Sequence, residues 1–590
     1  MKHNVKSHWQ LIHKVTLGIT MLVSAALSYS ASGLEVNPTS LSEIVHYGSS
    51  DDGNIILLGG FLQHGNEAKS TRYLDLFTFD RATGKLTLIS QGEGEQSSGQ
   101  GHSTSAIITP NGRWIAFESG APNLVPNDRN RTTDVFLYDR QSRKIDLVSR
   151  STDRSHAADG SSRLGDLSSD GRYVTFISNA SDLGLNQSQT HFALYRRDRL
   201  QNQTGSVSHR TYPSPNHTGF VGLTDRGVLE TSTDRTGTLV AFRTELFDGL
   251  ASSRTNPHRT STEIFVTDIR TQVTSWVSAP ARDTLIASLP NLKIDSRKRF
   301  QSYQHQLSKD GRYLYHLTDF TFNTEANPRR RTGRALLRYD RESNQSHLVS
   351  SQIANGNPAI NDSASYDISD DGRIAVFARS RDREDGSSWV DVLTWTDTEG
   401  TRSLLGNQTS ELFTPLTSAV QLSLSSDGEL ATFLGSIGPV PERQSIFISS
   451  HTSTAPAALA THSANNYYGA PKFLGNRTEL IIDQMSTFPG SRNHFEPVTF
   501  SNGDLRPRSL FSLPSDNRPT LQAELTLEGT TLSWHWQEGT RDTVEGTSSI
   551  TDPAWKPITT EYVKEGDKAT LHLKSPKPAQ QFFRLVRIQE

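Results

Sequence analysis

Short hydrophobic runs separated by polar Asp-Gly pairs recur along this chain. The stretch from Leu167 to Ser178 reads L-S-S-D-G-R-Y-V-T-F-I-S, and similar stretches begin at Ile108, Leu307 and Ile368. The runs are rich in the β-branched and aromatic residues that favour strands. Asp-Gly supplies the positive φ angles that a tight hairpin turn requires. Each stretch is therefore predicted to form a strand, a turn and a second strand.

A second hydrophobic run follows most of these turns, ends on Asp and leads into another turn. Val135–Arg140 (V-F-L-Y-D-R) and Leu336–Arg341 (L-L-R-Y-D-R) are examples, and a last run then closes on Ser, as in Ile145–Ser149. One repeat thus has four short strands in the order strand, turn, strand, variable loop, strand, turn, strand. The marker glycines are 56 to 74 residues apart and are Gly53, Gly112, Gly171, Gly237, Gly311, Gly372 and Gly428.

A four-stranded antiparallel meander that recurs at this spacing predicts a β-propeller. One such sheet exposes two apolar faces, and packing sheet against sheet in a closed ring buries both. An eighth repeat is expected around Lys472–Ile482, where the Asp-Gly pair is degraded. The predicted fold is therefore all-β, with an eight-bladed propeller over residues 35–514 and seven blades as the alternative. A Pro-flanked linker at 515–519 and a small β-sandwich-like C-terminal domain at 520–590 complete the prediction.

The N-terminus has the pattern of a secretory signal peptide. Lys2, Lys6 and Lys14 precede an uncharged run from Val15 to Leu34, and small residues follow its most apolar part. A basic start, a short apolar stretch and a small-residue exit predict a signal peptide over residues 1–32. The alternative is a signal anchor that stays in the membrane, although the run is short for the roughly 20 apolar residues of a membrane helix. The mature protein is expected to be exported to the periplasm, cell surface or medium, with no further membrane span.

Composition narrows the chemistry that the chain can perform. A net charge of −3 over 590 residues predicts no general attraction to nucleic acid or acidic membranes. The chain contains no cysteine, which removes disulfides, thiolate metal sites and cysteine nucleophiles. No cofactor is predicted, and we expect a monomer.

The repeats, with S-x-D-G-R-Y-V-x-F at 168–176 and D-V-F-L-Y-D-R at 134–140, resemble the TolB-like propeller family and its WD-like relatives among bacterial secreted proteins. This resemblance covers about four fifths of the chain and implies a propeller fold without implying one particular function. The tail is similar to a short C-terminal β domain of bacterial exported proteins. The residues that carry this second likeness are Leu532-Ser533-Trp534, Ala554-Trp555-Lys556-Pro557-Ile558 and Phe582-Phe583-Arg584-Leu585.

Motifs of common enzyme classes are missing from the sequence. It contains no G-x-S-x-G, H-E-x-x-H or Walker A pattern, and the nineteen histidines are scattered singly. The repeated Asp residues of the turns are interpreted as turn formers, so no catalytic residue is predicted. The chain is predicted to be a non-catalytic module that binds a protein or an acidic glycan. The alternative is an extracellular glycan-cleaving propeller, either a hydrolase or a lyase.

One loop has a metal-like spacing of oxygen ligands. Asp128, Asn130 and Asp134 occupy positions 1, 3 and 7, as ligands do in calcium loops, and Asp385, Ser387 and Asp391 repeat the spacing. Position 4 is Arg131, and no bidentate Glu follows at a suitable distance. The alternative is a set of Asx turns that lead into a strand. We expect that this loop binds no calcium tightly.

A basic segment lies in the fifth repeat. Between Lys293 and Arg341 there are twelve Lys or Arg residues and five Asp or Glu residues, a local charge of +7. Clustered guanidinium groups favour bidentate contacts with carboxylate, sulfate or phosphate. The alternative is a solvated loop that only keeps the protein soluble. The residues predicted to bind an anionic ligand, with the first three in the loop between the second and third strands, are Arg329, Arg330, Arg331 and Arg334.

Overall fold

The computed structural model describes an all-β chain. The described residues are 35–36, 41–62, 73–93, 98–184, 192–208, 211–213, 220–247, 260–294, 300–323, 325, 331–350, 362–382, 388–405, 416–437, 444–450, 457–461, 466–468, 471–475, 479–486 and the strands between 494 and 589. The predicted signal peptide at 1–32 and the predicted linker at 515–519 lie outside them. Among the described residues, no helix is long and apolar enough to cross a membrane.

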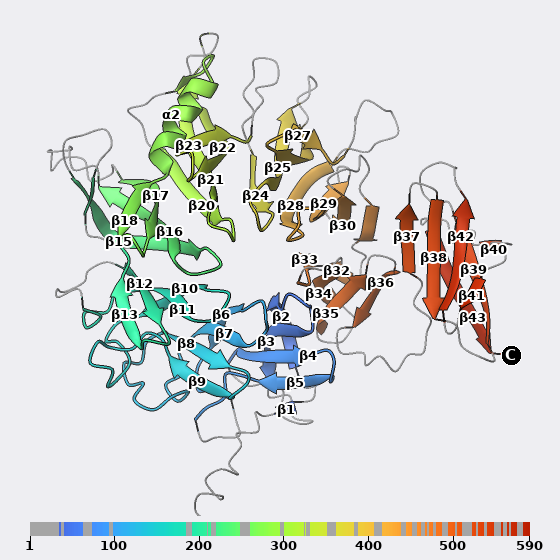
Figure 1. The fold of residues 1–590 in the computed structure, drawn as a ribbon, viewed down its shortest axis with the longest axis horizontal. Helices are drawn as coiled ribbons and strands as arrows, with labels where there is room; N and C mark the ends of the chain where they lie inside the picture. Colours follow the sequence, from blue (N-terminus) through green and yellow to red (C-terminus); the bar gives the residue numbers. More distant parts are fainter. Residues whose placement is uncertain are drawn as a thin grey trace, which may run out of the picture.

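The first half of the chain forms successive antiparallel meanders (Figure 1). The first meander contains β1 (Glu35–Val36), β2 (Leu41–Ser49), β3 (Ile55–Leu62), β4 (Asp75–Asp80) and β5 (Lys85–Leu88). The second contains β6 (Ser103–Ile108), β7 (Trp114–Ser119), β8 (Asp134–Asp139) and β9 (Lys144–Leu147). The third contains β10 (Ser162–Leu167), β11 (Tyr173–Ser178), β12 (Ala193–Asp198) and β13 (Gln203–Ser206). The fourth contains β14 (Thr211–Pro213), β15 (Phe220–Thr233), β16 (Leu239–Phe247), β17 (Thr260–Asp268) and β18 (Val273–Trp276).

The same pattern continues after a short helix, α2 (Ser278–Ser288). The fifth meander contains β19 (Lys293–Ile294), β20 (Gln301–Leu307), β21 (Tyr313–Asn323), β22 (Arg331–Asp340) and β23 (Gln345–Leu348). The sixth contains β24 (Asp362–Ile368), β25 (Ile374–Asp382), β26 (Ser388–Thr396) and β27 (Gly400–Ser403). The seventh contains β28 (Leu416–Leu424), β29 (Leu430–Ile437), β30 (Gln444–Ser450) and β31 (Ala457–Thr461). A further sheet contains β32 (Asn466–Tyr468), β33 (Lys472–Phe473), β34 (Leu480–Ser486), β35 (His494–Ser501) and β36 (Asp504–Ser509).

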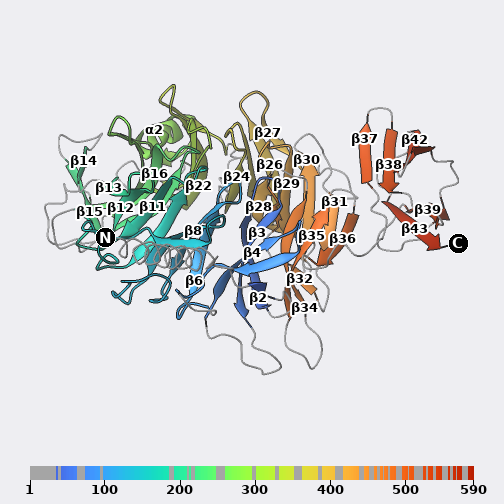
Figure 2. The same cartoon turned by 60° about the horizontal axis from the view of Figure 1, so that its bottom comes forward.

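The remaining strands form two smaller sheets at the C-terminal end (Figure 2). One has the order β37-β38-β42-β41 and the other the order β40-β39-β43. Their bounds are β37 (Gln522–Thr526), β38 (Gly529–His535), β39 (Thr540–Thr547), β40 (Lys556–Pro557), β41 (Val563–Glu565), β42 (Lys568–Lys574) and β43 (Phe582–Gln589).

The Asp-Gly turns have the local geometry that the sequence predicts. In the third meander the Ser168 hydroxyl donates to Asp170 Oδ1 at 2.6 Å, and Asp170 Oδ1 also accepts the Arg172 N–H at 2.9 Å. Gly171 has φ +70°, a left-handed conformation that residues with a Cβ rarely adopt. A Cβ at Gly171 would lie 2.2 Å from the Trp114 ring of the preceding meander. The glycine therefore serves both the turn and the packing between meanders.

Within a repeat, side-chain contacts join the Asp-Gly turn to the Asp-Arg pair at the end of the third strand. Arg172, which follows the turn glycine, pairs with Asp198 at the end of β12, with Nη2 2.8 Å from Oδ2. The next residue along, Arg199, donates back to the Gly171 carbonyl at 3.1 Å. Burial alone would raise the pKa of Asp198, but the hydrogen bonds from Arg172 hold the pKa below its ordinary value. The same reciprocal contacts join Arg113 with Asp139 and Arg312 with Asp340.

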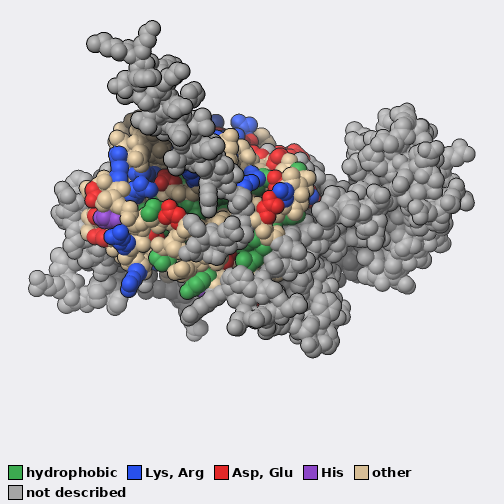
Figure 3. Space-filling model, turned by 90° about the horizontal axis from the view of Figure 1, so that it is seen from below, with side chains coloured by type: hydrophobic (Ala, Val, Ile, Leu, Met, Phe, Trp, Pro, Cys, Tyr) green, Lys and Arg blue, Asp and Glu red, His purple; other side chains and the backbone are tan. Residues whose placement is uncertain are grey.

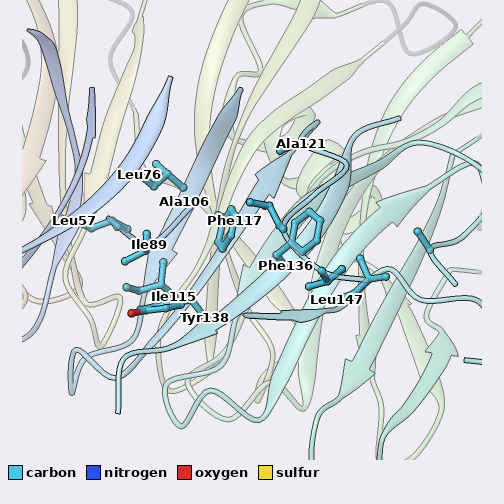
Figure 4. Packing of buried hydrophobic residues seen from close by; sticks show 13 residues of the cluster. Leu57, Leu76, Ile89, Ala106, Ile115, Phe117, Ala121, Phe136, Tyr138 and Leu147 are labelled. Carbon is cyan, nitrogen blue, oxygen red and sulfur yellow. The ribbon is translucent and has the colours of Figure 1, made fainter. Parts of the chain in front are cut away.

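Apolar residues from neighbouring meanders form the core. Figure 4 shows one such cluster, in which Leu57 and Leu76 of the first meander pack near Ile115 and Phe117 of the second. Phe117 stacks on Phe136 of the adjacent strand, with ring centroids 5.6 Å apart. Because central strands such as β7 and β8 are buried on both faces, they read as hydrophobic runs.

Backbone hydrogen bonds link the turns of most successive meanders. In each of these bonds, the N–H of the second turn residue donates to the C=O of the second turn residue in the next linked meander. Pro110 has no N–H, so it cannot continue the chain of donors to the third meander. The bonds, at 2.7 to 2.9 Å, run from Asp51 to Pro110, Ser169 to Arg235, Arg235 to Lys309, Lys309 to Asp370 and Asp370 to Ser426.

The sheet β32–β36 returns the chain to the first meander. Leu474 and Ile481 belong to the same buried cluster as Ile56, Leu58 and Phe77 of the first meander. The pattern of sheets in Figure 1 surrounds a common centre and brings blue β2 and β3 beside orange-brown β34 and β35. The two ends of the repeat array are therefore in direct contact.

Two polar contacts also join these ends. The Gly475 N–H donates to Ser49 Oγ at 3.0 Å, and a Cβ on Gly475 would lie 2.1 Å from the Asp51 carbonyl oxygen. Arg81 binds Glu479 through two hydrogen bonds of 2.9 and 2.7 Å, although 398 residues separate them in sequence. The degraded eighth turn thus lacks Asp-Gly but keeps a glycine at the point of closest approach.

Candidate functional site

The hairpin of β21 and β22 is longer than its counterpart in the third meander. β21 has 11 residues and β22 has 10, whereas β11 and β12 have 6 each. Their pairing runs without a register shift from Tyr313 opposite Asp340 to Phe322 opposite Arg331. The extension lies at the end of the hairpin that carries the predicted arginine loop.

Helix α2 supports this extension. It follows β18 and packs against β23, and Figure 1 shows it beside β21–β23. Leu285 and Leu289, from the helix and the residue that ends it, are buried in one cluster with Phe320, Phe322 and Ala335 of the hairpin. Burial of these apolar side chains fixes the base of the arginine loop on a rigid element.

The structure places the four predicted arginines differently. Arg329 and Arg330 lie outside the described residues. Arg331, which is predicted to lie in the loop, is instead the first residue of strand β22. The side chain of Arg331 is not described. Arg334 lies further along β22 and binds Asp319 with a 2.7 Å Nε–Oδ1 contact. Its guanidinium also lies over the Tyr303 ring, so Arg334 has a structural role in addition to any role in binding.

Other cations of the basic segment have acidic partners, some from outside the segment. Lys293 contacts Glu325 at 3.1 Å, and Arg338 binds Asp397 of the sixth meander. On the side of the molecule shown in Figure 3, basic and acidic side chains are likewise intermixed. The excess of positive charge in the segment is therefore partly neutralised, and Arg329, Arg330 and Arg331 remain the residues for which an anionic ligand is predicted.

The calcium-like loop is organised by hydrogen bonds within the protein. Asn130 Oδ1 accepts the Thr132 N–H at 2.9 Å, which is the Asx turn considered as the alternative to a metal site. The Asn130 amide donates to Asp134 Oδ2 and to the Ala158 carbonyl, both at 2.7 Å. An amide thus occupies the place beside Asp134 where a cation would be needed. Asp385 and Ser387 of the second loop lie outside the described residues.

Asp134 also takes part in a contact that is found within more than one repeat. Its Oδ1 accepts the Ser149 hydroxyl at 2.7 Å, and Ser149 Oγ accepts the Val135 N–H at 3.0 Å. The Ser that closes a repeat thereby anchors the fourth strand to the start of the third. Ser90 binds Asp75 at 2.8 Å in the same way and accepts the Leu76 N–H at 3.0 Å. The sequence shows this closing Ser in several repeats, but its partner is identified only in the folded chain.

Burial perturbs the two carboxyl groups of the loop. The pKa of Asp134 is raised to about 7, chiefly by burial; hydrogen bonds from Ser149 and Asn130 oppose this rise, and nearby Asp128 and Asp182 add to it. Burial raises the pKa of Asp128 to about 6, and its buried Oδ1 has no hydrogen-bond partner. Asp128 therefore keeps its proton in the folded state at pH values where the unfolded chain has lost it.

This geometry predicts that Asp128→Asn stabilises the protein at high pH. The raised pKa favours folding below about pH 4 and that advantage is lost as pH rises through 6, whereas Asn stays neutral throughout. We expect a gain of about 1 kcal/mol at pH 8, after allowance for solvent screening, and little change at pH 4. Urea unfolding at both pH values measures it. A parallel titration with millimolar calcium should leave the wild-type melting temperature unchanged, and a calcium-dependent rise that Asp128→Asn abolishes would contradict this account.

Polar residues at backbone bulges form a feature that sequence reasoning did not find. Glu43, Ser105, Gln304 and Gln421 are exposed and have positive φ angles of 48° to 55°. They lie in β2, β6, β20 and β28, each the strand that precedes the first turn of its meander, and these strands lie nearest the centre of the ring (Figure 1). Such conformations cost about 1 kcal/mol or more and are frequent at binding sites. No sequence signal marks them, because the bulge depends on strand register.

Comparisons with known proteins find likeness in structure only. No family model matches the chain, and no curated protein matches it. Solved structures that are similar include an oligogalacturonate lyase from Vibrio parahaemolyticus, with 11% identity, TM-score 0.37 and coverage of 70% of this chain and 92% of that one. The β-propeller domain of the Trilobed protease from Pyrococcus furiosus has 8% identity and TM-score 0.36, with coverage of 70% and 99%.

A putative TolB from Agrobacterium tumefaciens is also similar, with 12% identity, TM-score 0.26 and coverage of 52% of this chain and 80% of that one. These neighbours are β-propeller proteins, and the set includes peptidases and a lyase. The structural neighbours thus include β-propellers with and without catalytic activity in their names, and the chain itself is all-β.

Proposed function

We propose that this chain is an exported eight-bladed β-propeller with a small β-sandwich C-terminal domain, and that it binds an acidic glycan or protein without catalysis. The blade number is supported by the turn-to-turn hydrogen bonds and by the contact of Leu474 and Ile481 with the first meander. The charged residues of the repeats, such as Arg172 and Asp198, hold the turns of one blade together. Their occurrence in several repeats is thus explained by folding.

The observation that carries the binding proposal is the extended hairpin β21–β22 with its support from α2. Leu285, Phe320 and Phe322 pack in one buried cluster, so the end of the hairpin is held on a rigid base. A rigid base limits the conformational entropy that an arginine loop loses when it binds. Guanidinium groups at this end can form paired hydrogen bonds with sulfate or carboxylate groups of a polymer.

Replacement of Arg329, Arg330 and Arg331 together by Ser is expected to shorten retention on a heparin column markedly. The matched control replaces three exposed arginines of other turns, Arg129, Arg270 and Arg373, by Ser, because the loss of net charge is then equal. Binding that depends on charge must also weaken as salt rises, since screening at about 0.15 M limits exposed charges to roughly 8 Å. Equal retention of the two triple variants would refute a specific anion site in this hairpin.

The glycan-cleaving alternative is tested on the same purified mature protein. Incubation with acidic polysaccharides, followed by analysis of chain length, should show binding without a change in polymer size. Cleavage of any polysaccharide by protein purified to homogeneity would refute the non-catalytic proposal and favour the glycan-cleaving enzyme. N-terminal sequencing of protein exported by a host cell tests removal of residues 1–32, and an intact N-terminus on the exported protein would contradict the signal-peptide prediction.

A further inference from the structure

Two buried histidines meet where the fifth meander packs against the fourth. The ladder between β20 and β21 pairs Gln306 with Tyr315 and Tyr303 with Leu317, and the register shift between these pairs leaves Gln304 and His305 against the single residue His316. The His305 side chain is 1% exposed and His316 is fully buried. The Nε2 atoms of both rings are buried and have no hydrogen-bond partner. An unpaired buried nitrogen is costly, so two of them at one bulge require an explanation.

The other nitrogen of each ring is already engaged. His305 Nδ1 lies 3.3 Å from Glu230 Oε1 of β15, and Arg243 binds the same carboxylate oxygen at 3.0 Å. His316 Nδ1 lies 3.0 Å from Thr318 Oγ1. Histidines that bind metals commonly use one ring nitrogen for the metal and give the other to a carboxylate, carbonyl or hydroxyl partner. Both rings have this arrangement, with Nε2 left over.

A third unpaired polar atom, a hydroxyl oxygen, lies in β15 of the fourth meander. Ser232 Oγ in β15 is buried without a partner. It is two residues from Glu230 along β15, the strand that contacts His305. Alternate residues of a strand share a face, and Ser232 is paired with Ala241, which belongs to the cluster that joins the fourth and fifth meanders. Glu230 is 32% exposed, so the interface is reachable from solvent.

The two imidazole rings lie close enough together to interact electrostatically. Within the described part of the chain, no three His, Cys, Asp or Glu side chains form a complete metal cage. A site here would therefore use two imidazoles, with a hydroxyl and water to complete it.

We propose that His305 and His316 bind one divalent transition-metal ion of the zinc type through their Nε2 atoms, with Ser232 Oγ and water as further ligands and Glu230 as the outer partner of His305. Imidazole is a preferred ligand of zinc, and open positions filled by water are usual where the protein supplies fewer than four ligands. The site joins the innermost strands of two neighbouring meanders. Its function would be independent of the arginine hairpin.

The test uses untagged mature protein that has been stripped with a chelator. Isothermal titration with Zn²⁺ should show one equivalent bound per chain, and zinc should raise the melting temperature of the wild type. His305→Ala and His316→Ala should each abolish both effects. Co²⁺ in place of zinc should give a visible absorption band that is absent from both variants.

Two further variants keep the test decisive. His46→Ala removes another buried histidine whose Nε2 lacks a partner, in β2 of the first meander, and should leave zinc binding unchanged. Glu230→Gln keeps both imidazoles and should weaken zinc affinity by about 10- to 100-fold, so it carries the test if the histidine variants do not fold. A wild-type protein that binds no zinc, or binding that survives His316→Ala and Glu230→Gln unchanged, would overturn the proposal in favour of a buried water.

Discussion

Replacement of Gly171 by Ala is expected to lower the free energy of unfolding by about 2 to 4 kcal/mol. Two effects add at this position. The residue has φ +70°, which costs an L-residue with a Cβ about 1 to 2 kcal/mol. The new methyl group would also lie 2.2 Å from the Trp114 ring, which must move or distort the contact between two meanders. Chemical denaturation monitored by tryptophan fluorescence measures the change.

Two glycines separate these effects. Gly400 has φ +72° but open space around its Cα, so Gly400→Ala should cost only about 1 kcal/mol. Gly120 has open space and no positive φ, so Gly120→Ala should change stability little. If Gly171→Ala were no more destabilising than Gly400→Ala, the result would contradict close packing of the Gly171 turn against the preceding meander.

Removal of either partner of the Arg81–Glu479 pair is expected to destabilise the protein by about 1.5 to 3 kcal/mol. The two hydrogen bonds are charge-assisted, and the side chains are only 26% and 17% exposed. A double-mutant cycle with Arg81→Met and Glu479→Gln should give a coupling energy of about 1 kcal/mol or more. The pair is the polar part of the contact between the first and last sheets.

The control pair for this cycle lies within the first meander. Lys85 and Glu35 are 2.7 Å apart, but both side chains are more than half exposed, so their coupling should be below about 1 kcal/mol. Equal coupling energies for the two pairs would show that the Arg81–Glu479 pair is no stronger than an exposed surface ion pair. The pair would then contribute no buried polar contact between the chain's two ends.

Much of the repeat architecture follows from the sequence, because its determinants are local. Asp170 and Gly171 specify a turn through their own side chain and backbone, wherever the turn lies in the chain. The strand, turn and strand predicted around Lys472–Ile482 are confirmed as β33, a turn at Gly475 and β34, although the Asp-Gly pair is degraded.

Helix α2 was not predicted from the sequence. It is short, weakly amphipathic and has Pro280 in its first turn, so its stability comes from packing of residues such as Leu285 on the fifth meander. Sequence periodicity cannot detect a helix whose apolar contacts are made with strands far away in the sequence.

The candidate sites depend more strongly still on contacts between residues that are distant in the sequence. His305 and His316 are eleven positions apart and look solitary in the sequence, and the register shift in β20 is what places them at one bulge. Glu230, 75 residues before His305, approaches only because two meanders pack together. Arg334 shows the reverse, since its charge indicated a ligand site and its contact with Asp319 gives it a structural role.

Zero-length carbodiimide cross-linking tests closure of the ring most directly. In Arg81→Lys, the new amine should lie near the Glu479 carboxylate, while Lys85 beside Glu35 at 2.7 Å serves as the internal control in the same digest. Mass spectrometry should identify a linked peptide pair that joins residues 81 and 479 within one monomeric chain. Recovery of the Lys85–Glu35 link without any 81–479 link would contradict a propeller whose first and last sheets meet.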